Sequence, residues 1–445
     1  MLSQSIPVFD ELLDTVFRAE RRTLAARDAT LRLLLLDTIG CIVAGLKHPT
    51  VDAMARALAA DGGATALPGS TLRLESGAAA FVTGLAACWD EACEGLPEAH
   101  GRPGLHAIAA VLPLALAIER PLGDLLWAID VGYEFGGRAG QVCRIKPGMH
   151  VDGSWGLLAA VAAVAAFRHP DRKQVLADSL AAASCQIPFS LYAPVAQGSS
   201  ARNTYVGHAA ALAPLLVASA ASGIGGVRGG LDDYLAIALG REAGAAIVAG
   251  AAERLVPRGY LKPFAAVRHV HYAAYAALAL REAVRGRVDA IAAITLETYS
   301  EAIRYCGNRA PRTAIQAQFS LSYGAAWALL RGDLDPAAYR PEALADAQVR
   351  RTESMITLQA ADRPDEKRYA RLRVVFADGT AEHAEAIDIP GDPLNPMPPD
   401  AVHAKFVRFA GETLGKAQAD AFARRLLDAD PAAPCRAVLA PLLQG

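Results

Sequence analysis

A chain of 445 residues exceeds the size of one ordinary hydrophobic core and predicts two or three domains. Hydrophobic residues make up 53% of it and charged residues 20%, and alanine dominates many segments, which favours closely packed helices over a β-sandwich. A net charge of −2 and a pI near 6.6, without a run of five or six basic residues, argue against nucleic-acid binding.

The sequence also carries signals about location. Its first residues are acidic and amphipathic, without the basic start and unbroken apolar core of a signal peptide. Apolar runs such as 156–167 and 209–223 are shorter than the roughly 18 residues of a membrane span. The seven cysteines are scattered and form no Cys-x-x-Cys pair, which suits reduced thiols and predicts neither a zinc ribbon nor an iron–sulfur motif. We expect a cytoplasmic protein that does not enter a membrane.

The first part of the chain predicts a series of helices. The expected helices before residue 270 are 9–22, 29–46, 50–63, 77–88, 106–138, 156–167, 172–187 and one that begins near 207. A strand-like or loop segment, 64–76, interrupts them. The glycine-rich stretch 223–230 follows no strand and precedes no P-loop lysine, so we reject a nucleotide-binding interpretation.

The pattern then changes to a mixture of strands and helices. Residues 287–299, 351–362 and 369–390 predict strands, with an Asp-Gly hairpin turn at 378–379, and 314–332 predicts one helix between them. Residues 391–399 are rich in proline, and the final helices are apolar enough to pack back on the first domain. We predict a mainly α fold, with an all-helical domain (1–268 with 396–445) and a smaller α+β domain (269–395).

Titratable side chains concentrate in residues 88–113, between two apolar helices. The stretch contains Asp90, Glu91, Glu94, Glu98, His100, Arg102 and His106. Loops held by rigid elements often carry catalytic groups, although a solvated acidic loop is the alternative. Cys88 and Cys93 lie in the same stretch, and we interpret them as buried, unreactive thiols.

Three further places supply candidate residues. His150 and Asp152 lie in a glycine-flanked loop directly before a helix. A helix N-terminus at this place would lower the pKa of the His150 imidazole and favour the binding of carboxylates. The alternative is that His150 is a structural histidine. Arg202 stands alone before a helix of small residues, as a carboxylate-binding fork or a surface arginine. The helix start near 270 adds four more, namely Lys262, Arg268, His269 and His271.

Several short motifs in a fixed order carry a resemblance to a known family. They are 35–45, 106–119, 131–138, 148–156, 207–218, 262–271, 317–332, the Asp-Gly-Thr at 378–380 and the Lys-Phe at 405–406. Together they resemble the MmgE/PrpD family, which includes 2-methylcitrate dehydratases, cis-aconitate decarboxylases and iminodisuccinate epimerases. The resemblance implies a homodimer with a site between an all-helical and an α+β domain, and no metal or organic cofactor.

Residue by residue, the resemblance implies catalytic roles for His106, His150 and His271, for Tyr323 in the FSLSY segment, and for Lys262. The chain also departs from the family pattern. Glu91 stands where the family often has the first aspartate of an acidic run, Gly95 replaces a threonine, Arg202 replaces a lysine and Tyr275 an aspartate. These departures leave the identity of the carboxylate open.

The expected chemistry is proton removal next to a carboxylate. Arg202, Lys262 and Arg268 are expected to bind substrate carboxylates and to stabilise an enediolate-like intermediate. We predict His150 and His271 as the acid–base pair, Tyr323 as a second proton donor, and His106 with Glu91 as orienting partners.

Each of these assignments has an alternative. His271 and Tyr323 could instead be core residues, and His269 and His208 are interpreted as structural. A hydro-lyase is the leading interpretation. An epimerase, isomerase or decarboxylase is the nearest alternative, and a catalytically inactive helical scaffold is the third.

Overall fold

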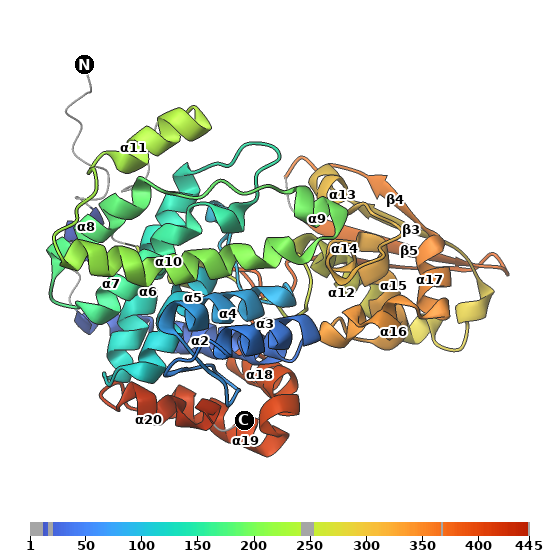
Figure 1. Ribbon diagram of the computed structural model, residues 1–445. Helices are drawn as coiled ribbons and strands as arrows, with labels where there is room; N and C mark the ends of the chain where they lie inside the picture. Colours follow the sequence, from blue (N-terminus) through green and yellow to red (C-terminus); the bar gives the residue numbers. More distant parts are fainter. Residues whose placement is uncertain (1–11, 17–20, 242–252, 366–367, 444–445) are drawn as a thin grey trace.

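The large domain is built from helices that come from both ends of the chain (Figure 1). The computed structural model describes residues 12–16, 21–241, 253–365 and 368–443. The helices that precede the small domain are α2 (Asp28–Leu46), α3 (Pro49–Ala59), α4 (Ser76–Trp89), α5 (Pro103–Ala117), α6 (Leu122–Val142), α7 (Gly156–Arg168), α8 (Lys173–Ser184), α9 (Ala193–Gln197), α10 (Thr204–Ala221) and α11 (Gly230–Tyr234). The segment between α3 and α4 forms a two-stranded antiparallel pair, β1 (Thr65–Ala66) and β2 (Arg73–Leu74).

Small residues let the central helices approach closely. Helix α4 packs against α2, α5 and α10. A Cβ atom on Gly84 of α4 would lie 2.8 Å from the backbone nitrogen of Gly207 in α10, so glycine is required where these two backbones cross. Nearby, Nη1 of Arg202 donates to the carbonyl oxygen of Cys88, 3.2 Å away. The crossing therefore brings the end of α4 beside the start of α10.

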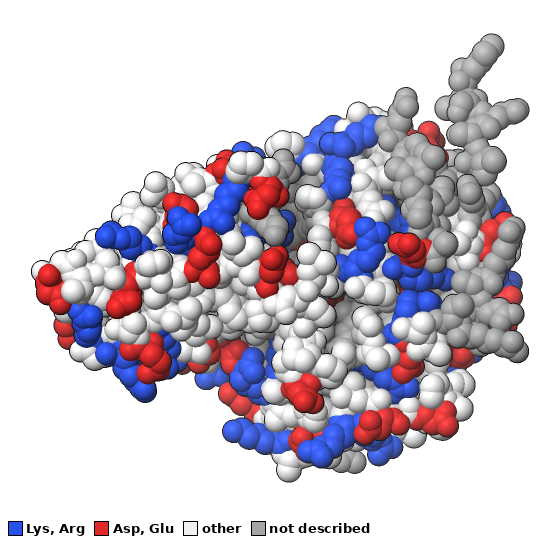
Figure 2. All heavy atoms as spheres, turned by 180° about the vertical axis from the view of Figure 1, so that it is seen from behind, with Lys and Arg blue, Asp and Glu red and all other residues white. Residues whose placement is uncertain are grey.

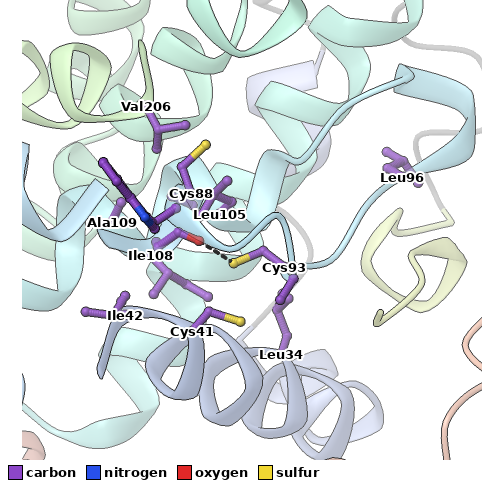
Figure 3. Close-up of a cluster of buried hydrophobic side chains, with 14 of the residues drawn as sticks. Leu34, Cys41, Ile42, Cys88, Cys93, Leu96, Leu105, Ile108, Ala109 and Val206 are labelled. Atoms are coloured by element: carbon purple, nitrogen blue, oxygen red, sulfur yellow. Dashed lines mark hydrogen bonds between the residues drawn. The ribbon is translucent and has the colours of Figure 1, made fainter. Parts of the chain in front are cut away.

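Apolar side chains fill the space beneath the loop that follows α4 (Figure 3). Leu34 and Ile42 of α2 and Ile108 of α5 are buried there. The thiol of Cys93 donates to the carbonyl oxygen of Ala87 at 3.0 Å, and its contact with Cys41 together with burial raises its pKa well above the usual range. Cys93 is thus a core side chain, as the sequence predicted.

The small domain is one four-stranded sheet with helices on it. Its elements are α12 (Arg268–Val284), β3 (Ile291–Thr298), α13 (Ser300–Cys306), α14 (Ala314–Gln318), α15 (Leu321–Arg331), α16 (Pro341–Leu344), α17 (Ala347–Ser354), β4 (Ile356–Ala360), β5 (Tyr369–Phe376) and β6 (Ala381–Ile387). The strand order is β4-β3-β5-β6; β3 and β4 are parallel, and the other neighbours are antiparallel. Helix α12 packs against α15, β5 and β6.

Two local predictions for this domain were wrong in detail, each because of a helix cap. Residues 314–332 are two helices, because the hydroxyl of Ser320 accepts from the backbone N–H of Tyr323 and starts a new helix. The predicted strand at 351–362 begins only at Ile356, because Asp346 caps α17, which runs on to Ser354. The Asp-Gly hairpin is confirmed, with Gly379 at φ +84° between β5 and β6.

The C-terminal helices return to the large domain. They are α18 (Pro399–Leu414), α19 (Lys416–Asp428) and α20 (Cys435–Leu439). Helix α18 packs against α2 and α20 against α5, and Nζ of Lys405 pairs with Asp37 at 2.7 Å. The prediction of a mainly α fold with a smaller α+β domain is confirmed. Of the helix predicted at 9–22, the structure describes residues 12–16, which are helical, and the 3-10 turn Arg21–Ala26.

Length and apolar composition alone would allow two of the described helices to cross a membrane. They are α2 and the helical stretch Ser200–Ala221, which contains α10. The most apolar window of α2 is 78% buried in the protein, as in a core helix, whereas that of Ser200–Ala221 is 44% buried. Helix α10 thus keeps an uncovered apolar face, with Leu215 64% exposed. Acidic and basic side chains are interspersed over the face seen in Figure 2.

Candidate functional site

A cavity of about 420 Å³ lies between the two domains, a size that suits a small molecule. It is lined by the loop after α4, the loop after α6, the segment that leads into α12, and residues of α13 and the start of β5. Its ionisable lining consists of six cations (Arg102, Arg144, Arg202, Lys262, Arg268 and Arg368), three carboxylates (Glu91, Asp152 and Glu301) and three histidines (His100, His150 and His269). The excess of cations favours an anion over a cation in this cavity.

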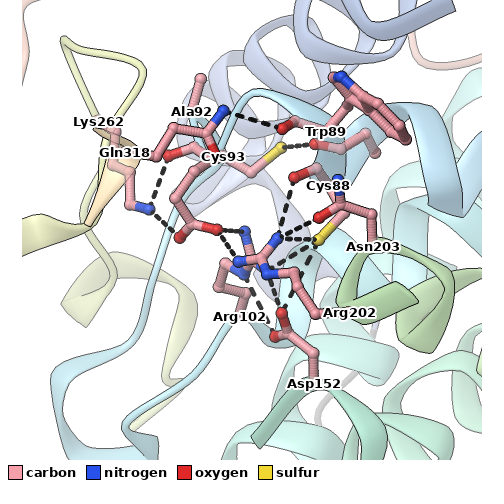
Figure 4. Close-up of polar contacts among 12 residues, drawn as sticks. Cys88, Trp89, Ala92, Cys93, Arg102, Asp152, Arg202, Asn203, Lys262 and Gln318 are labelled. Carbon is pink, nitrogen blue, oxygen red and sulfur yellow. Dashed lines mark hydrogen bonds and ion pairs between the residues drawn. The ribbon is translucent and has the colours of Figure 1, made fainter. Parts of the chain in front are cut away.

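Glu91 is the centre of a buried ion-pair network. Figure 4 labels its partners Arg102, Arg202 and Lys262. Its carboxylate accepts from Nζ of Lys262 at 2.7 Å and from Nη1 of Arg102 at 3.2 Å, and it pairs with Arg202. Burial alone would raise the pKa of Glu91, but Arg102, Lys262 and Arg202 together hold it below its ordinary value. Glu91 is therefore ionised at neutral pH and ties together three separate parts of the chain.

Asp152 is the second carboxylate of this network. It pairs with Nη2 of Arg102 and accepts from Nε of the same guanidinium at 3.3 Å. Burial raises its pKa, but Arg102 and a contact with His106 lower it well below the usual range. We call Glu91, Asp152, Arg102, Arg202 and Lys262 the floor network. Its three cations and two carboxylates leave one positive charge.

The loop that carries Glu91 is held in an unusual conformation. Glu91 follows α4 with φ at 52°, in the left-handed region that non-glycine residues rarely adopt. Nζ of Lys262 donates to the carbonyl oxygen of Glu91 at 2.9 Å. Nζ of Lys405 donates to the carbonyl oxygen of Ala92 at 2.8 Å. Two buried ammonium groups from distant segments thus fix the backbone on which the floor network is built.

His150 lines the cavity as a neutral imidazole. Its Nδ1 accepts from the backbone N–H of Asp152 at 3.1 Å, so the ring proton is on Nε2. Burial lowers the pKa of His150 to about 4, against the opposing effect of Asp152. The sequence argument assigned such a shift to a helix N-terminus, whereas burial is the largest cause here. His150 can therefore donate the Nε2 proton at neutral pH.

His269 also lines the cavity, although the sequence suggested a structural role. Its Nδ1 lies 2.5 Å from the hydroxyl of Tyr299, and burial lowers its pKa to about 3, with further effects of Arg368 and Lys262. It is neutral at pH 7, and Nε2 is the ring nitrogen that the Tyr299 contact leaves unused.

His271 is two positions further along α12 and projects from the opposite side of the helix. It is fully buried and is not part of the cavity lining. Its Nε2 lies 3.0 Å from the carbonyl oxygen of Ala266, and its Nδ1 lies 3.4 Å from Nη1 of Arg268. Burial, with a further effect of Arg268, lowers its pKa well below the usual range. Its predicted role as an acid or base stays a prediction.

Tyr323 and His106 also lie outside the cavity lining. The hydroxyl of Tyr323 donates to the carbonyl oxygen of Ala338 at 2.5 Å, and the ring stacks on Trp327. His106 lies behind the floor network, with Nε2 3.9 Å from Oδ1 of Asp152. A Cβ atom on Gly156 would lie 2.4 Å from the ring of His106, so this glycine leaves room for the imidazole. The predicted proton donation by Tyr323 and the orienting role of His106 remain predictions.

Of the predicted substrate-binding residues, Arg202, Lys262 and Arg268 all line the cavity. Arg268 pairs with Asp392 and lies over the ring of Tyr260, with Cζ 5.0 Å from the ring centroid. The sequence analysis assigned no role to four other lining residues, Arg144, Tyr260, Glu301 and Arg368. Glu301 lies in the first turn of α13 and the other three lie in connecting segments, and no sequence motif marks any of them.

Within the described ranges, no group of three or more His, Cys, Asp or Glu side chains is arranged to hold a metal ion. A search of the curated proteins found no match. Residues 12–234 match the MmgE/PrpD N-terminal domain, and residues 264–429 match the MmgE/PrpD C-terminal domain. The two matches are in the family's order and cover most of the chain. The chain therefore belongs to the MmgE/PrpD family.

Proposed function

We propose that this protein is a cofactor-independent hydro-lyase that acts on a small di- or tricarboxylate by removing a proton next to a carboxylate. The observation that carries the proposal is the cavity itself, in which a cationic floor and two neutral histidines from different domains face one volume of about 420 Å³. The family, which includes dehydratases, decarboxylases and epimerases, supports the same class of chemistry.

The floor network supplies the electrostatic part of the reaction. Arg202 and Lys262 are 1% and 2% exposed, so a substrate carboxylate beside them interacts in a medium of low polarity. As the C–H bond breaks, negative charge moves onto that carboxylate and forms an enediolate-like intermediate. The positive charge that Glu91 and Asp152 leave uncompensated stabilises this intermediate more than the substrate.

The two histidines supply the proton transfers. In the proposed step, Nε2 of His269 takes the proton from the carbon next to the carboxylate, with its Nδ1–H donated to Tyr299. The electron pair of that C–H bond forms the C=C bond, and the C–O bond breaks. Nε2–H of His150 protonates the departing hydroxide, so that water leaves, and the imidazolate that remains regains a proton when the His269 imidazolium loses its own. The buried environment that lowers both histidine pKa values makes each a neutral group at pH 7.

An epimerase is the second candidate, and one observation favours it. His150 belongs to the large domain and His269 to the small domain, and both line the cavity. Two neutral histidines that reach one substrate from different domains suit removal of a proton by one and its return by the other. This reaction keeps the same residues and loses no water.

Proton NMR in deuterated water tests the proposal and separates the two candidates. The purified protein is incubated with methylcitrate, citrate, cis-aconitate, iminodisuccinate and simpler 2- or 3-hydroxy acids. A new vinylic signal supports the hydro-lyase, deuterium at the α-carbon without loss of water supports the epimerase, and loss of carbon dioxide supports a decarboxylase. If the NMR spectrum of none of these acids changes and no carboxylate binds, the proposal is contradicted and an inactive scaffold is favoured.

Variants of three histidines then identify the base. We expect H269N and H150N to lower turnover by at least about a hundredfold, the scale of acid–base catalysis, with the fold retained by circular dichroism. H271N is the matched variant, two positions away on the other side of the helix. A hundredfold loss in H271N with near-normal H269N would return the role of base to His271.

A further inference from the structure

The outer part of the cavity carries cations that the floor network does not use. Arg144 and Arg368 are half-buried and His100 is exposed, whereas Arg102, Arg202 and Lys262 are at most 6% exposed. All of them line the same cavity. The graded exposure separates an inner cationic group from an outer one.

The outer arginines lack the carboxylate partners that the inner cations have. Glu91 and Asp152 neutralise much of the floor, and Asp392 pairs with Arg268. Arg144 and Arg368 form no side-chain hydrogen bond or ion pair with any residue in the described ranges. Each guanidinium is half-buried, and the charge of Glu301 acts on Arg368 without forming an ion pair, so both side chains can still bind an anion.

The two arginines come from different domains and line the same cavity as His100. Arg144 follows α6, and Arg368 immediately precedes β5. Burial lowers the pKa of His100, the positive charges of Arg144 and Arg368 lower it further, and Glu301 opposes this effect. His100 has φ at 51°, so the loop is held in a left-handed conformation at this point, as it is at Glu91.

We infer that Arg144, Arg368 and His100 form a second anion subsite, which binds a carboxylate of the substrate remote from the reacting carbon. The inference rests on the proposed function. One substrate carboxylate accepts hydrogen bonds from both guanidiniums, one from each domain, and lies beside the imidazole. Glu301, which also lines the cavity, opposes anions here and disfavours groups of higher charge such as a phosphate dianion.

The subsite predicts which acids bind. One carboxylate occupies the floor network, and a second or third reaches the outer arginines. A monocarboxylate contacts the floor alone. The protein therefore discriminates among acids by the number and spacing of their carboxylates, and the outer arginines determine that specificity.

Binding of two unreactive acids tests the inference, namely tricarballylate, with three carboxylates, and butyrate, with one. Dissociation constants are measured by calorimetry and ligand-observed NMR at fixed ionic strength. We expect R144Q and R368Q each to weaken tricarballylate binding by about tenfold and to change butyrate binding by less than twofold. R202Q is expected to weaken both acids. R285Q removes the same charge from an exposed position outside the cavity and should change neither.

The outcomes separate the subsite from the proposed function. Tricarballylate binding that depends on Arg202 but is unchanged in R144Q and R368Q would overturn the subsite alone. Failure of both acids to bind the wild-type protein would overturn the proposed function and the subsite with it. Inorganic phosphate that binds more tightly than tricarballylate, in a manner that depends on Arg144 and Arg368, would overturn the assignment to a carboxylate.

Discussion

Replacing Glu91 with glutamine removes the charge at the centre of the floor network and keeps the shape of the side chain. Arg102, Arg202 and Lys262 would then share Asp152 as the remaining carboxylate of the network. Breaking a buried ion pair by removing one partner costs about 3–5 kcal/mol, because the remaining charges stay out of water. We expect E91Q to lower the free energy of unfolding by that amount at pH 7 and to abolish turnover.

The difference in the free energy of unfolding between E91Q and the wild type should also depend on pH. The folded-state pKa of Glu91 lies below its ordinary value of 4.5. The stability that its charge contributes is therefore complete above pH 4.5 and is lost as the pH falls towards the lower folded-state pKa. At pH 3, 1.5 units below the ordinary value, the difference between E91Q and the wild type should be smaller by about 2 kcal/mol, at 1.36 kcal/mol per unit.

Urea unfolding followed by tryptophan fluorescence and circular dichroism measures both quantities. D90N is the matched control, because Asp90 is the buried neighbour of Glu91 and does not pair with the cations of the floor network. Burial raises the pKa of Asp90 to about 7, so at pH 7 about half of this group is ionised and its amide variant removes less charge than E91Q does. The prediction is wrong if the free energy of unfolding of E91Q lies within about 1 kcal/mol of the wild-type value at pH 7. It is also wrong if the difference between the two free energies grows as the pH falls.

Three further predictions concern other groups. Burial raises the pKa of Glu94 to about 8, so the wild type loses stability as the pH rises from 4.5 through 8. In urea unfolding, the free energy of unfolding of E94Q should therefore rise by about 4 kcal/mol relative to that of the wild type between pH 5 and pH 9. A difference that stays constant over this range would contradict the prediction. The double variant D37L/K405M replaces a buried ion pair with apolar groups and should keep the melting temperature of the wild type. Its kcat should fall at least about tenfold, because the carbonyl oxygen of Ala92 loses its hydrogen-bond donor. An unchanged kcat would show that Lys405 does not position the loop. Because α10 has an uncovered apolar face, we propose that the protein forms a homodimer through this helix. Light scattering should give twice the monomer mass for the wild type and the monomer mass for L215D. Binding of the wild type to lipid vesicles would indicate that a membrane covers this face instead.

The sequence predicted features that depend on local pattern and on residue type. Alanine-rich apolar runs predicted the helices, and the Asp-Gly pair predicted the β5–β6 hairpin. Charged residues in otherwise apolar sequence marked candidate site residues, with Glu91 in a cluster of titratable side chains, Arg202 alone before a helix and Lys262 near the start of another. All three meet in the cavity.

Features that depend on helix phase or on tertiary contacts could not be predicted in the same way. From the sequence we expected His271 to be catalytic and His269 to be structural, whereas the packing of α12 against α15 turns His269 towards the cavity and His271 away from it. Tyr323 lies in a motif of the family but turns into the core, where its hydroxyl finds the carbonyl oxygen of Ala338. Arg144 and Arg368 come to line one cavity through the contact between domains, which leaves no mark in the local sequence.

The contact of Lys405 with Ala92 joins residues 313 positions apart. During synthesis, the loop that carries Glu91 is made early, but its backbone is not fixed until α18 has been added and has packed on α2. Closing so long a loop is slow compared with forming local helices. Chains that end before residue 405 lack the donor to the carbonyl oxygen of Ala92, so we expect prematurely terminated products to be inactive even where their N-terminal helices have folded.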